Sequence, residues 1–320
     1  VLPSISTLSD GGFVVVWTSK NQDTSSFGIF GQRYDAAGET IGSEFQVNTY
    51  TDGSQYYPSV AALPDGRFVV AWDSAGQDGS NTGAYAQLFD SQGQKQGEEF
   101  QANTFVSGYQ SGASVSSSVS GEFVVAWYGS GEDADQLDIY GQFFHGDGSK
   151  KGAEIHVNTY TDGWQQGPHA TVLDGGKTLI AWQSEHSQDG DSAGVFAQYF
   201  DGDGQPDGEE FQVNSYITNT QSSPSIAATP GGSAVVVWHT VGQDGDSYGI
   251  AGQLIDPDGQ NVGPEFVVNL YFQNAQQHPE VAAFPDGSFV VVWCGWDHQD
   301  GSGKGIFAQR FDKDGNRLYH

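Results

Sequence analysis

The chain has 320 residues, and 40 acidic side chains against 11 basic ones give it a formal charge of −29. A field of that sign repels phosphate backbones and anionic lipids, which argues against nucleic acid and membrane surfaces as partners. The single cysteine, Cys294, excludes an internal disulfide, and no run of residues approaches the ~18 apolar positions of a membrane-inserted helix.

A repeat of about 55 residues fills the chain, and a fixed period of this kind decides the architecture before any single residue is interpreted. The copies start near residues 3, 58, 113, 168, 224 and 279. Each contains a tryptophan that closes a phrase such as GGFVVVW or GRFVVAW, at Trp17, Trp72, Trp127, Trp182, Trp238 and Trp293.

Each copy is predicted to form four short strands. In the second copy these are 58–63, 67–72, 83–89 and 98–104, with turns at 64–66 and 90–93. Four antiparallel strands per copy, six times over, predict an all-β fold: a six-bladed β-propeller of four-stranded blades, as one domain over residues 1–320.

Strand chemistry orders each blade from the inside outwards. The first strand is made of small residues, as a crowded central channel requires, and the second is apolar on both faces. The fourth alternates, with Phe45 and Val47 opposite Glu44 and Gln46, so it is expected at the solvated outer edge. The loops between strands two and three, and between consecutive blades, then emerge on one face.

The sixth copy stops at NRLYH, before the outer strand that the other copies contain. Either a short strand within 317–320 completes the last blade, or a longer parent chain supplies the missing strand upstream of Val1. We expect the second, so that the domain is part of a longer chain.

The phrase W-x-S-x-G-Q-D-G, followed after the third strand by E-F-Q-V-N-T-Y-T, resembles repeats of large secreted bacterial adhesin-like and RTX-type proteins. The resemblance covers all six copies. It implies secretion, a multidomain parent and a calcium requirement. The RTX nonapeptide itself does not occur, so no calcium ligand is carried over by motif.

An aspartate recurs in the loop after the second strand, and two roles are open for it. It either closes the loop by accepting backbone hydrogen bonds, or it helps to bind calcium, which wants about 6–8 oxygen ligands. The metal candidates are Asp78, Glu132, Asp133, Asp135, Asp138, Asp189, Asp191, Asp244, Asp246 and Asp300. The third loop, GEDADQLD, is the most acidic, and is either a metal site or an eroded copy.

Function in a repeat protein is expected where the copies differ. At the second position of PSVAA-like first strands, four copies have serine, while the fourth has His169 and the sixth has Glu280, which are expected to face one cavity. Nearby loops add aromatic and histidine side chains. The candidate ligand-binding residues are Trp164, His169, His186, His278, Glu280, Trp296 and His298. An exposed Trp there is either a sugar platform or a side chain that packs over its own loop.

No catalytic residue is assigned from the sequence. There is no serine nucleophile motif, HExxH motif or phosphate-binding glycine loop, and four arginines are too few for a sialidase-type carboxylate clamp. We therefore expect a secreted, non-catalytic binding or adhesion module whose partner is a glycan or another cell-surface or matrix component, with calcium as a candidate stabiliser. Neighbouring domains or further copies are also expected as partners.

Two other functions remain open. One is a structural repeat unit of a surface layer or fibre, in which the repeats only space neighbouring chains. The other is a glycan-active enzyme, which would require His169 and Glu280 to reach one substrate as an acid/base pair.

Overall fold

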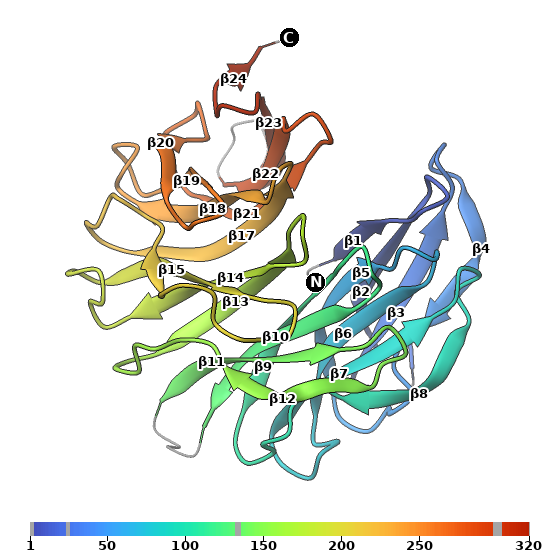
Figure 1. The fold of residues 1–320 in the computed structure, drawn as a ribbon. Coiled ribbons are helices and arrows are strands. Elements are labelled where there is room, and N and C mark those ends of the chain that lie inside the picture. The colour runs from blue at the N-terminus through green and yellow to red at the C-terminus, as the bar shows by residue number, and fades with distance from the viewer. Residues whose placement is uncertain (1–2, 24–25, 132–135, 297–302, 320) are drawn as a thin grey trace. The chain divides into compact units, whose positions relative to one another are not determined.

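The computed structural model describes residues 3–23, 26–131, 136–296 and 303–319. These residues form 24 strands and no helix, arranged as six four-stranded antiparallel sheets in chain order (Figure 1). The chain is therefore an all-β, six-bladed β-propeller, as the repeat predicts. Within the described part of the chain, no helix has the length and apolar character that crossing a membrane requires.

Residues 1–157 form one compact unit, which holds blades one to three. Blade one contains β1 (Ser4–Thr7), β2 (Phe13–Lys20), β3 (Phe27–Tyr34) and β4 (Thr40–Gln46). Blade two contains β5 (Gln55–Ala62), β6 (Phe68–Ala75), β7 (Thr82–Phe89) and β8 (Lys95–Gln101). Blade three contains β9 (Gln110–Ser117), β10 (Phe123–Ser130), β11 (Leu137–Phe144) and β12 (Lys150–His156).

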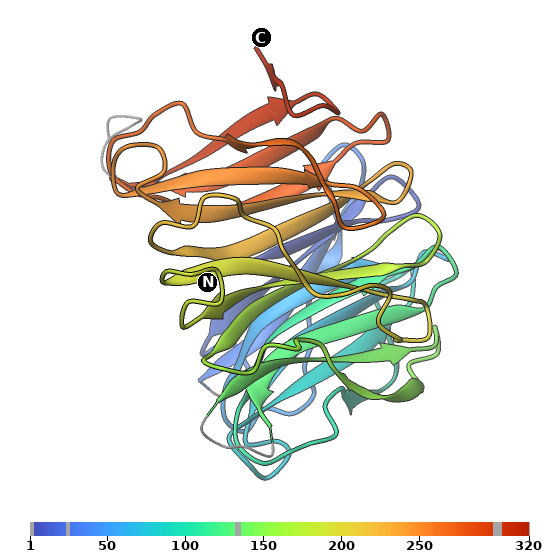
Figure 2. The same ribbon diagram turned by 60° about the vertical axis from the view of Figure 1, so that its left-hand side comes forward.

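Residues 158–320 form the second unit, whose three sheets are seen as successive layers in Figure 2. Blade four contains β13 (Gln165–Val172), β14 (Thr178–Glu185), β15 (Ala193–Phe200) and β16 (Phe211–Gln212). Blade five contains β17 (Gln221–Thr229), β18 (Ser233–Val241), β19 (Tyr248–Ile255) and β20 (Asn261–Val267). Blade six contains β21 (Gln276–Ala283), β22 (Phe289–Gly295), β23 (Gly305–Phe311) and the short β24 (Arg317–Leu318), which pairs with β23.

In blade two, the blade whose strand limits were predicted, all four strands begin or end one to three residues away from the prediction. In blade two the first strand begins at Gln55 and not at 58, because a register shift between Tyr56 and Ser59 lets the chain turn through Tyr57 (φ 50°) and then continue the ladder. The fourth strand ends at Gln101, because Asn103 turns its side chain back into the blade.

Aromatic side chains join neighbouring blades. Phe68 and Phe89 of blade two stack with ring centroids 4.9 Å apart, and Phe45 of the preceding outer strand lies 5.3 Å from Phe89. The same arrangement recurs in later blades (Phe100 on Phe123 and Phe144; Phe266 on Phe289 and Phe311). The outer strand is thus solvated as predicted, yet in blades one, two and five its one phenylalanine packs against the next blade.

A buried asparagine after the outer strand holds the loop between blades. In blade four, Asn214 Oδ1 accepts the Val195 N–H at 2.8 Å, and its Nδ2 donates to Tyr216 O at 3.0 Å and to Gln221 Oε1 at 3.2 Å. The first-strand glutamine in turn donates to Thr218 O at 2.9 Å. The equivalent asparagines bond in the same way, at Asn48, Asn103 and Asn269.

Two further repeated polar residues have structural roles. The third-strand glutamines satisfy backbone carbonyls, as when Gln87 Nε2 donates to Leu88 O at 3.0 Å and Gln96 O at 3.2 Å. The Asp-x-x-Gly sequences form hairpin turns, in which Asp90 Oδ1 accepts two backbone N–H groups. Both assignments agree with the expectation that shared residues serve the fold.

We expect Asn214→Ala to lower the free energy of unfolding by about 3 kcal/mol, because it leaves a buried N–H, a carbonyl and a glutamine without their partners. Denaturant unfolding measures this loss. The exposed Asn261 of the same unit gives the control, and Asn261→Ala is expected to change stability by at most ~0.5 kcal/mol. Equal effects of the two substitutions would contradict the role assigned to Asn214.

Candidate functional site

His169 serves first as a bridge between blades. In most described blades a serine at this position accepts a backbone N–H from the next blade: Ser59 Oγ from Val115 at 3.1 Å, and Ser225 Oγ from Val281 at 3.3 Å. His169 Nδ1 accepts the Ile226 N–H at 3.3 Å in the same manner. The imidazole therefore replaces a serine hydroxyl in a contact that the repeat already makes.

Glu280 belongs to the same row of first strands, two blades further on. Its carboxylate is exposed, and Oε2 accepts a hydrogen bond from Ser225 Oγ at 2.9 Å. Burial lowers the pKa of His169, while the negative charge of Glu280 opposes that shift. The structure therefore places Ser225 between His169 and Glu280, and no hydrogen bond joins the imidazole to the carboxylate among the described contacts.

Two other predicted ligand residues meet in blade four. Trp164 is 46% exposed, and its carbonyl accepts the Glu185 N–H at 2.9 Å. His186 follows Glu185 and lies so close to Gly163 that a Cβ there would meet its Nδ1 at 2.1 Å. The Trp164 and His186 side chains thus lie on neighbouring loops of one blade.

The remaining predicted ligand residues are in blades five and six. His278 is exposed and has a left-handed backbone (φ 54°), and its ring centroid lies 6.5 Å from that of His239. Trp296 is partly buried beneath Lys304, whose Nζ is 3.4 Å from the ring centroid. His298 lies outside the described residues.

The loop aspartates are engaged in hydrogen bonds that close loops. Asp244 Oδ1 accepts the Asp246 N–H at 3.3 Å, and its Oδ2 accepts Asn269 Nδ2 at 2.8 Å. Asp246 Oδ2 reaches the next loop and accepts the Asn274 N–H at 2.8 Å. Asp189 accepts the Asp191 N–H and Asn214 Nδ2 in the same way, and Asp191 accepts the Asn219 N–H of the next loop. Asp78 also accepts a loop N–H, from Ser80, but its Oδ2 accepts Gln101 Nε2 at 3.5 Å.

The third loop contributes one described metal candidate. Asp138 Oδ2 lies 3.5 Å from Nε2 of His156. Glu132, Asp133 and Asp135, together with Asp300 of the sixth loop, lie outside the described residues. Among the residues that are described, no group of three or more acidic, histidine or cysteine side chains is arranged to hold a metal ion.

Sequence reasoning missed a more variable position, the residue directly after the repeated tryptophan. It differs in every copy: Thr18, Asp73, Tyr128, Gln183, His239 and Cys294. The same comparison of the copies that singles out His169 and Glu280 would also have singled out this position.

Asp73 at this position is a buried carboxylate, 1% exposed, that bridges blades two and three. Its Oδ2 accepts hydrogen bonds from Ser111 Oγ and from the Gly112 N–H at 2.8 Å, and its Oδ1 accepts the Ala113 N–H at 3.1 Å. Burial raises the pKa of Asp73 to about 6, although all three hydrogen bonds act to lower it.

The third of these bonds depends on a second departure from the repeat. The other five copies have proline where blade three has alanine, at Pro3, Pro58, Pro168, Pro224 and Pro279. Proline has no N–H to donate, so only Ala113 can complete the set around Asp73. The two substitutions therefore form one structural unit.

Tyrosines connect this carboxyl to the surface. Ser111, which donates to Asp73, also hydrogen-bonds with the partly buried Tyr128, and Tyr128 hydrogen-bonds with Tyr109. The Tyr109 and Tyr128 ring centroids are 5.9 Å apart, and Tyr109 is 37% exposed. Burial raises the pKa of Tyr128, so its hydroxyl stays protonated.

Tyr57 completes the group, which we call the Asp73 cluster (Asp73, Ser111, Tyr128, Tyr109 and Tyr57). Tyr57 is 50% exposed and held with φ 50° at the bulge of β5. Burial raises its pKa, and the charges of Tyr109 and Asp73 add to that shift, which reflects their proximity. A protonatable carboxyl thus lies beneath two exposed aromatic rings.

The second unit has a different pair at the equivalent place. Ser222 Oγ and His239 Nε2 are 2.5 Å apart, and Nδ1 of His239 has no hydrogen-bond partner among the described residues. Burial and then the neighbouring His278 lower the pKa of His239 to about 4, so its imidazole is neutral at pH 7. The pair lacks the third group that orients the imidazole in serine hydrolases.

Comparison with known proteins places the chain by its fold. No protein family matches it, and no curated protein matches it by sequence. An α-L-arabinofuranosidase of Fusarium graminearum has a TM-score of 0.64 at 15% identity, covering 98% of this chain and 92% of that one. An α-L-arabinanase of Penicillium chrysogenum, complexed with arabinobiose, gives 0.63 at 14%, covering 98% and 93%. An ulvan lyase gives 0.62 at 11%, covering 98% and 79%.

These structures overturn the expected function. All three are glycan-cleaving enzymes, whereas the sequence was interpreted as a non-catalytic adhesion module, with a surface-layer or fibre unit as its alternative. Both interpretations are wrong, because they rested on the shared repeats and on motifs from other enzyme folds. At 11–15% identity the likeness establishes the fold, so activity has to be argued from this chain's own residues.

We expect the contribution of Asp73 to stability to fall as the pH rises. Its folded-state pKa of about 6 lies above the ordinary 3.8, so the contribution is full below pH ~3.8 and is lost as the pH passes ~6, by about 3 kcal/mol. This loss is measured as the difference in unfolding free energy between the wild type and Asp73→Thr. Threonine is the residue that blade one has at this position. A difference that stays constant from pH 4 to pH 7 would contradict it.

Calcium binding by the loop aspartates stays a prediction, and chelation tests it. An ion bound only by the folded state raises the melting temperature by mass action. If the loops bind calcium, removal of the ion lowers the melting temperature, and Asp246→Asn reduces that response. An identical melting curve with chelator and with added calcium would show that the loops close without metal.

Proposed function

We propose that this chain is a glycan-active enzyme whose acid/base centre is the Asp73 cluster. One observation carries the proposal: a buried carboxyl with a pKa of about 6 is joined through hydroxyl groups to an exposed tyrosine. The similarity to three glycan-cleaving propellers supports it. Cleavage of a glycosidic bond requires a proton on the departing oxygen, and an acid of this pKa supplies one near neutral pH.

The proton would reach the substrate through the tyrosines, because Asp73 itself is only 1% exposed. Each hydroxyl both donates and accepts a hydrogen bond. The Tyr109 hydroxyl would give its proton to the leaving oxygen and take a proton from Tyr128. Tyr128 would take a proton from Ser111, and Ser111 would take the carboxyl proton of Asp73, which ends as the carboxylate. The raised pKa of Tyr128 keeps its phenol protonated until the proton is passed on.

The two exposed rings provide a surface for the sugar. Tyr57 and Tyr109 are amphipathic side chains whose faces pack against the apolar face of a sugar ring, while their hydroxyls bond to its polar edge. Tyr57 is fixed in position by its left-handed backbone at the β5 bulge. Substrate bound on this surface lies directly above the proton supply.

We also propose that the protein is secreted and that it belongs to a longer chain with neighbouring domains or self-associating copies. The resemblance of its repeats to large secreted bacterial proteins supports this. Calcium in the strand-two to strand-three loops is a further proposal on the same ground. None of these is needed for the chemistry assigned to the Asp73 cluster.

We expect the protein to release reducing ends or unsaturated products from at least one polysaccharide in a panel that includes arabinan, ulvan, and neutral and cationic glycans. Asp73→Asn is expected to reduce kcat about 100-fold or more, and Tyr109→Phe to reduce kcat more than it changes KM. The wild-type rate should fall above pH ~6, as Asp73 loses its proton.

Asp65→Asn is the matched control, because Asp65 is an exposed carboxylate of the same blade that pairs with Arg67 at 2.7 Å. It should leave the rate unchanged. Full activity in both Asp73→Asn and Tyr109→Phe would remove the cluster from the mechanism, and a panel without turnover would reject the enzymatic function.

A further inference from the structure

Blades one to five have a glutamate at the same position of the outer-strand segment, and in blades two, four and five its two oxygens receive different partners. In blade two, Glu99 Oε2 accepts the Thr49 N–H of the inter-blade loop, and its Oε1 accepts Gln77 Nε2 at 2.8 Å. The second partner is always a glutamine from the loop after the second strand. The pairs in the other blades with this bond are Gln22 with Glu44, Gln188 with Glu210, and Gln243 with Glu265.

Blade three keeps the first contact and changes the second. Glu154 Oε2 accepts the Thr104 N–H, as the repeat requires. The position that holds glutamine elsewhere is Glu132, which lies outside the described residues. No described residue donates a hydrogen bond to the other oxygen of Glu154. The carboxylate thus lacks the amide donor that its counterparts have.

A nearby lysine does not replace that donor. Lys150 Nζ donates to Thr104 Oγ1 at 3.0 Å, and Glu154 acts to raise its pKa, although burial has the larger, lowering effect. Lys95 stands in the same relation to Glu99 in blade two, where the glutamine is present as well. The lysine therefore belongs to the common arrangement of the repeat.

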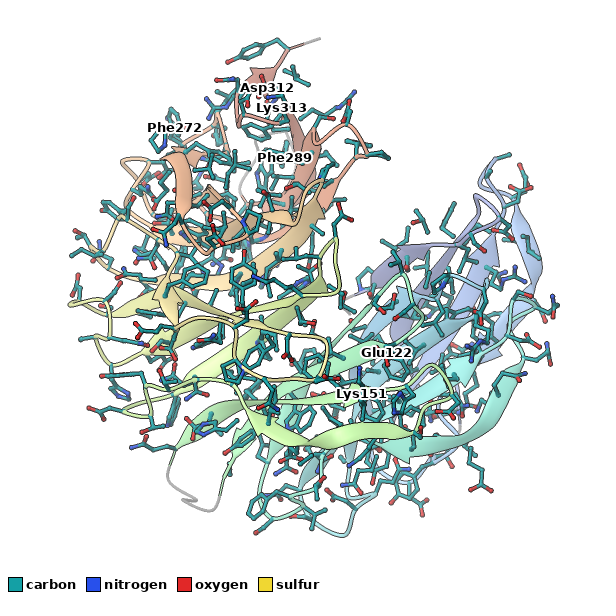
Figure 3. The ribbon with its side chains drawn as sticks, viewed as in Figure 1. Glu122, Lys151, Phe272, Phe289, Asp312 and Lys313 are labelled. Carbon is teal, nitrogen blue, oxygen red and sulfur yellow. The ribbon has the colours of Figure 1, made fainter. Side chains whose placement is uncertain are left out.

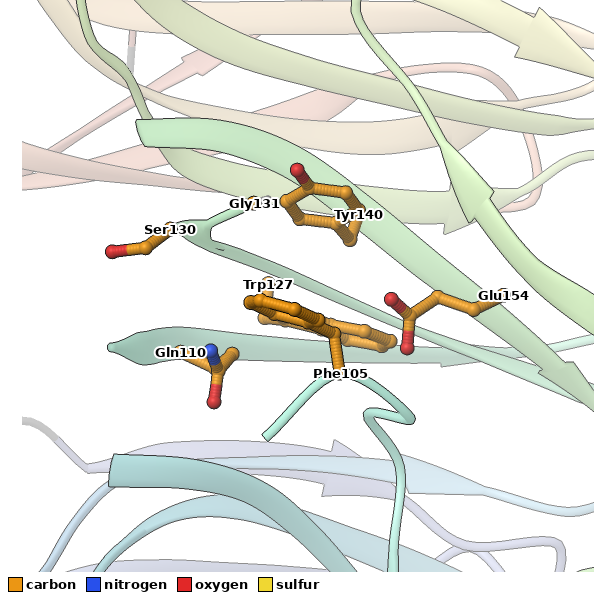
Figure 4. Close-up of a pocket in the computed structure, with 7 residues that line it drawn as sticks. All are labelled: Phe105, Gln110, Trp127, Ser130, Gly131, Tyr140 and Glu154. Carbon is orange, nitrogen blue, oxygen red and sulfur yellow. The ribbon is translucent and has the colours of Figure 1, made fainter. Parts of the chain in front are cut away.

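A cavity of about 200 Å³ opens beside this carboxylate (Figure 4). Phe105, Trp127 and Tyr140 line it, and the Glu154 carboxylate points toward the rings. Tyr140 is partly buried, whereas its counterpart Tyr85 in blade two is 5% exposed. Three aromatic rings and the Glu154 carboxylate therefore line the same cavity.

The absence of a side chain at Gly131 leaves room for the Tyr140 hydroxyl in the cavity wall. A Cβ at that position would meet the phenol oxygen at 2.3 Å. The Tyr140 ring also stacks with His156, with 5.2 Å between the ring centroids. The ring therefore has close neighbours both at its hydroxyl and along its face.

These groups select a cation with an apolar body. Aromatic faces attract an ammonium group, and a carboxylate oxygen without a donor takes a charge-assisted hydrogen bond from it. The volume lies below the range of about 300–1,000 Å³ that is usual for larger ligands, so the cavity suits a single ring. A sugar that carries a protonated amine has both features.

The charge of the whole protein favours the same ligand. A formal charge of −29 repels uronate and sulfate groups and concentrates a polycation at the surface. Basic side chains that could offset this charge are few, and Lys151 of blade three is already paired with Glu122 at 3.0 Å (Figure 3).

We propose that the blade-three cavity binds an amino-sugar residue with a free ammonium group, so that the glycan substrate is a cationic one. This inference rests on the proposed function for its substrate, but the binding itself does not. Gln110 and Trp127 of the cavity are the chain neighbours of Ser111 and Tyr128. Because successive side chains of a strand point to opposite faces of a sheet, the cavity lies on the other face of blade three from Ser111 and Tyr128.

Calorimetric titration with glucosamine oligomers and with fully N-acetylated oligomers of the same length tests the proposal. The free amines are expected to bind at least about tenfold more tightly, and Glu154→Gln to remove that preference. Its amide oxygen still accepts the Thr104 N–H, so the fold is retained, and a melting curve checks this. Phe105→Ala is expected to weaken binding of the glucosamine oligomers as well.

Glu265→Gln is the matched control, because it changes the same position of blade five, where Gln243 already occupies the carboxylate. It should leave binding unchanged. Equal binding of both oligomer types, or unchanged binding by Glu154→Gln, would overturn the proposal. If the wild type shows no turnover, the proposed enzymatic function is rejected. If Asp73→Asn still binds the glucosamine oligomers, the proposed binding site is supported independently of that function.

Discussion

One buried asparagine side chain fixes the point at which the inter-blade loop enters the first strand of the next blade. It joins the third strand, the inter-blade loop and the first-strand glutamine in four of the described blades, at Asn48, Asn103, Asn214 and Asn269. Since these bonds are buried, the loop enters the first strand at a fixed point. The bulge residue and its neighbours are then held on a rigid frame, and their side chains can vary without moving the backbone.

The fold could be predicted because its signals are local and repeated six times. Period, alternation and turn residues are all visible in short windows, and the Asp-x-x-Gly turns and third-strand glutamines took the roles expected of them. The strand limits could not be predicted, since they depend on a bulge at Tyr57 and on an inward turn at Asn103. Each of these involves partners on another strand.

The candidate site was harder to foresee for the same reason. Asp73 directly follows the repeated tryptophan of an ordinary strand sequence. Its partners lie 38 to 40 residues further along the chain, in the next blade. The predicted residues His169 and Glu280 are unusual in sequence, yet His169 performs a contact that serine performs elsewhere. The class of function was misjudged because propellers hold binding proteins and enzymes alike, and no local motif separates them.

The pairing of Asp73 with Ala113 constrains how six similar copies could have diverged. With proline at position 113, an aspartate at position 73 would be buried with one donor fewer, at a cost in stability. Alanine there without the aspartate would leave the buried Ala113 N–H without its acceptor, which is also costly. Each substitution alone therefore leaves a buried polar group short of a partner, so the two positions are expected to have changed together.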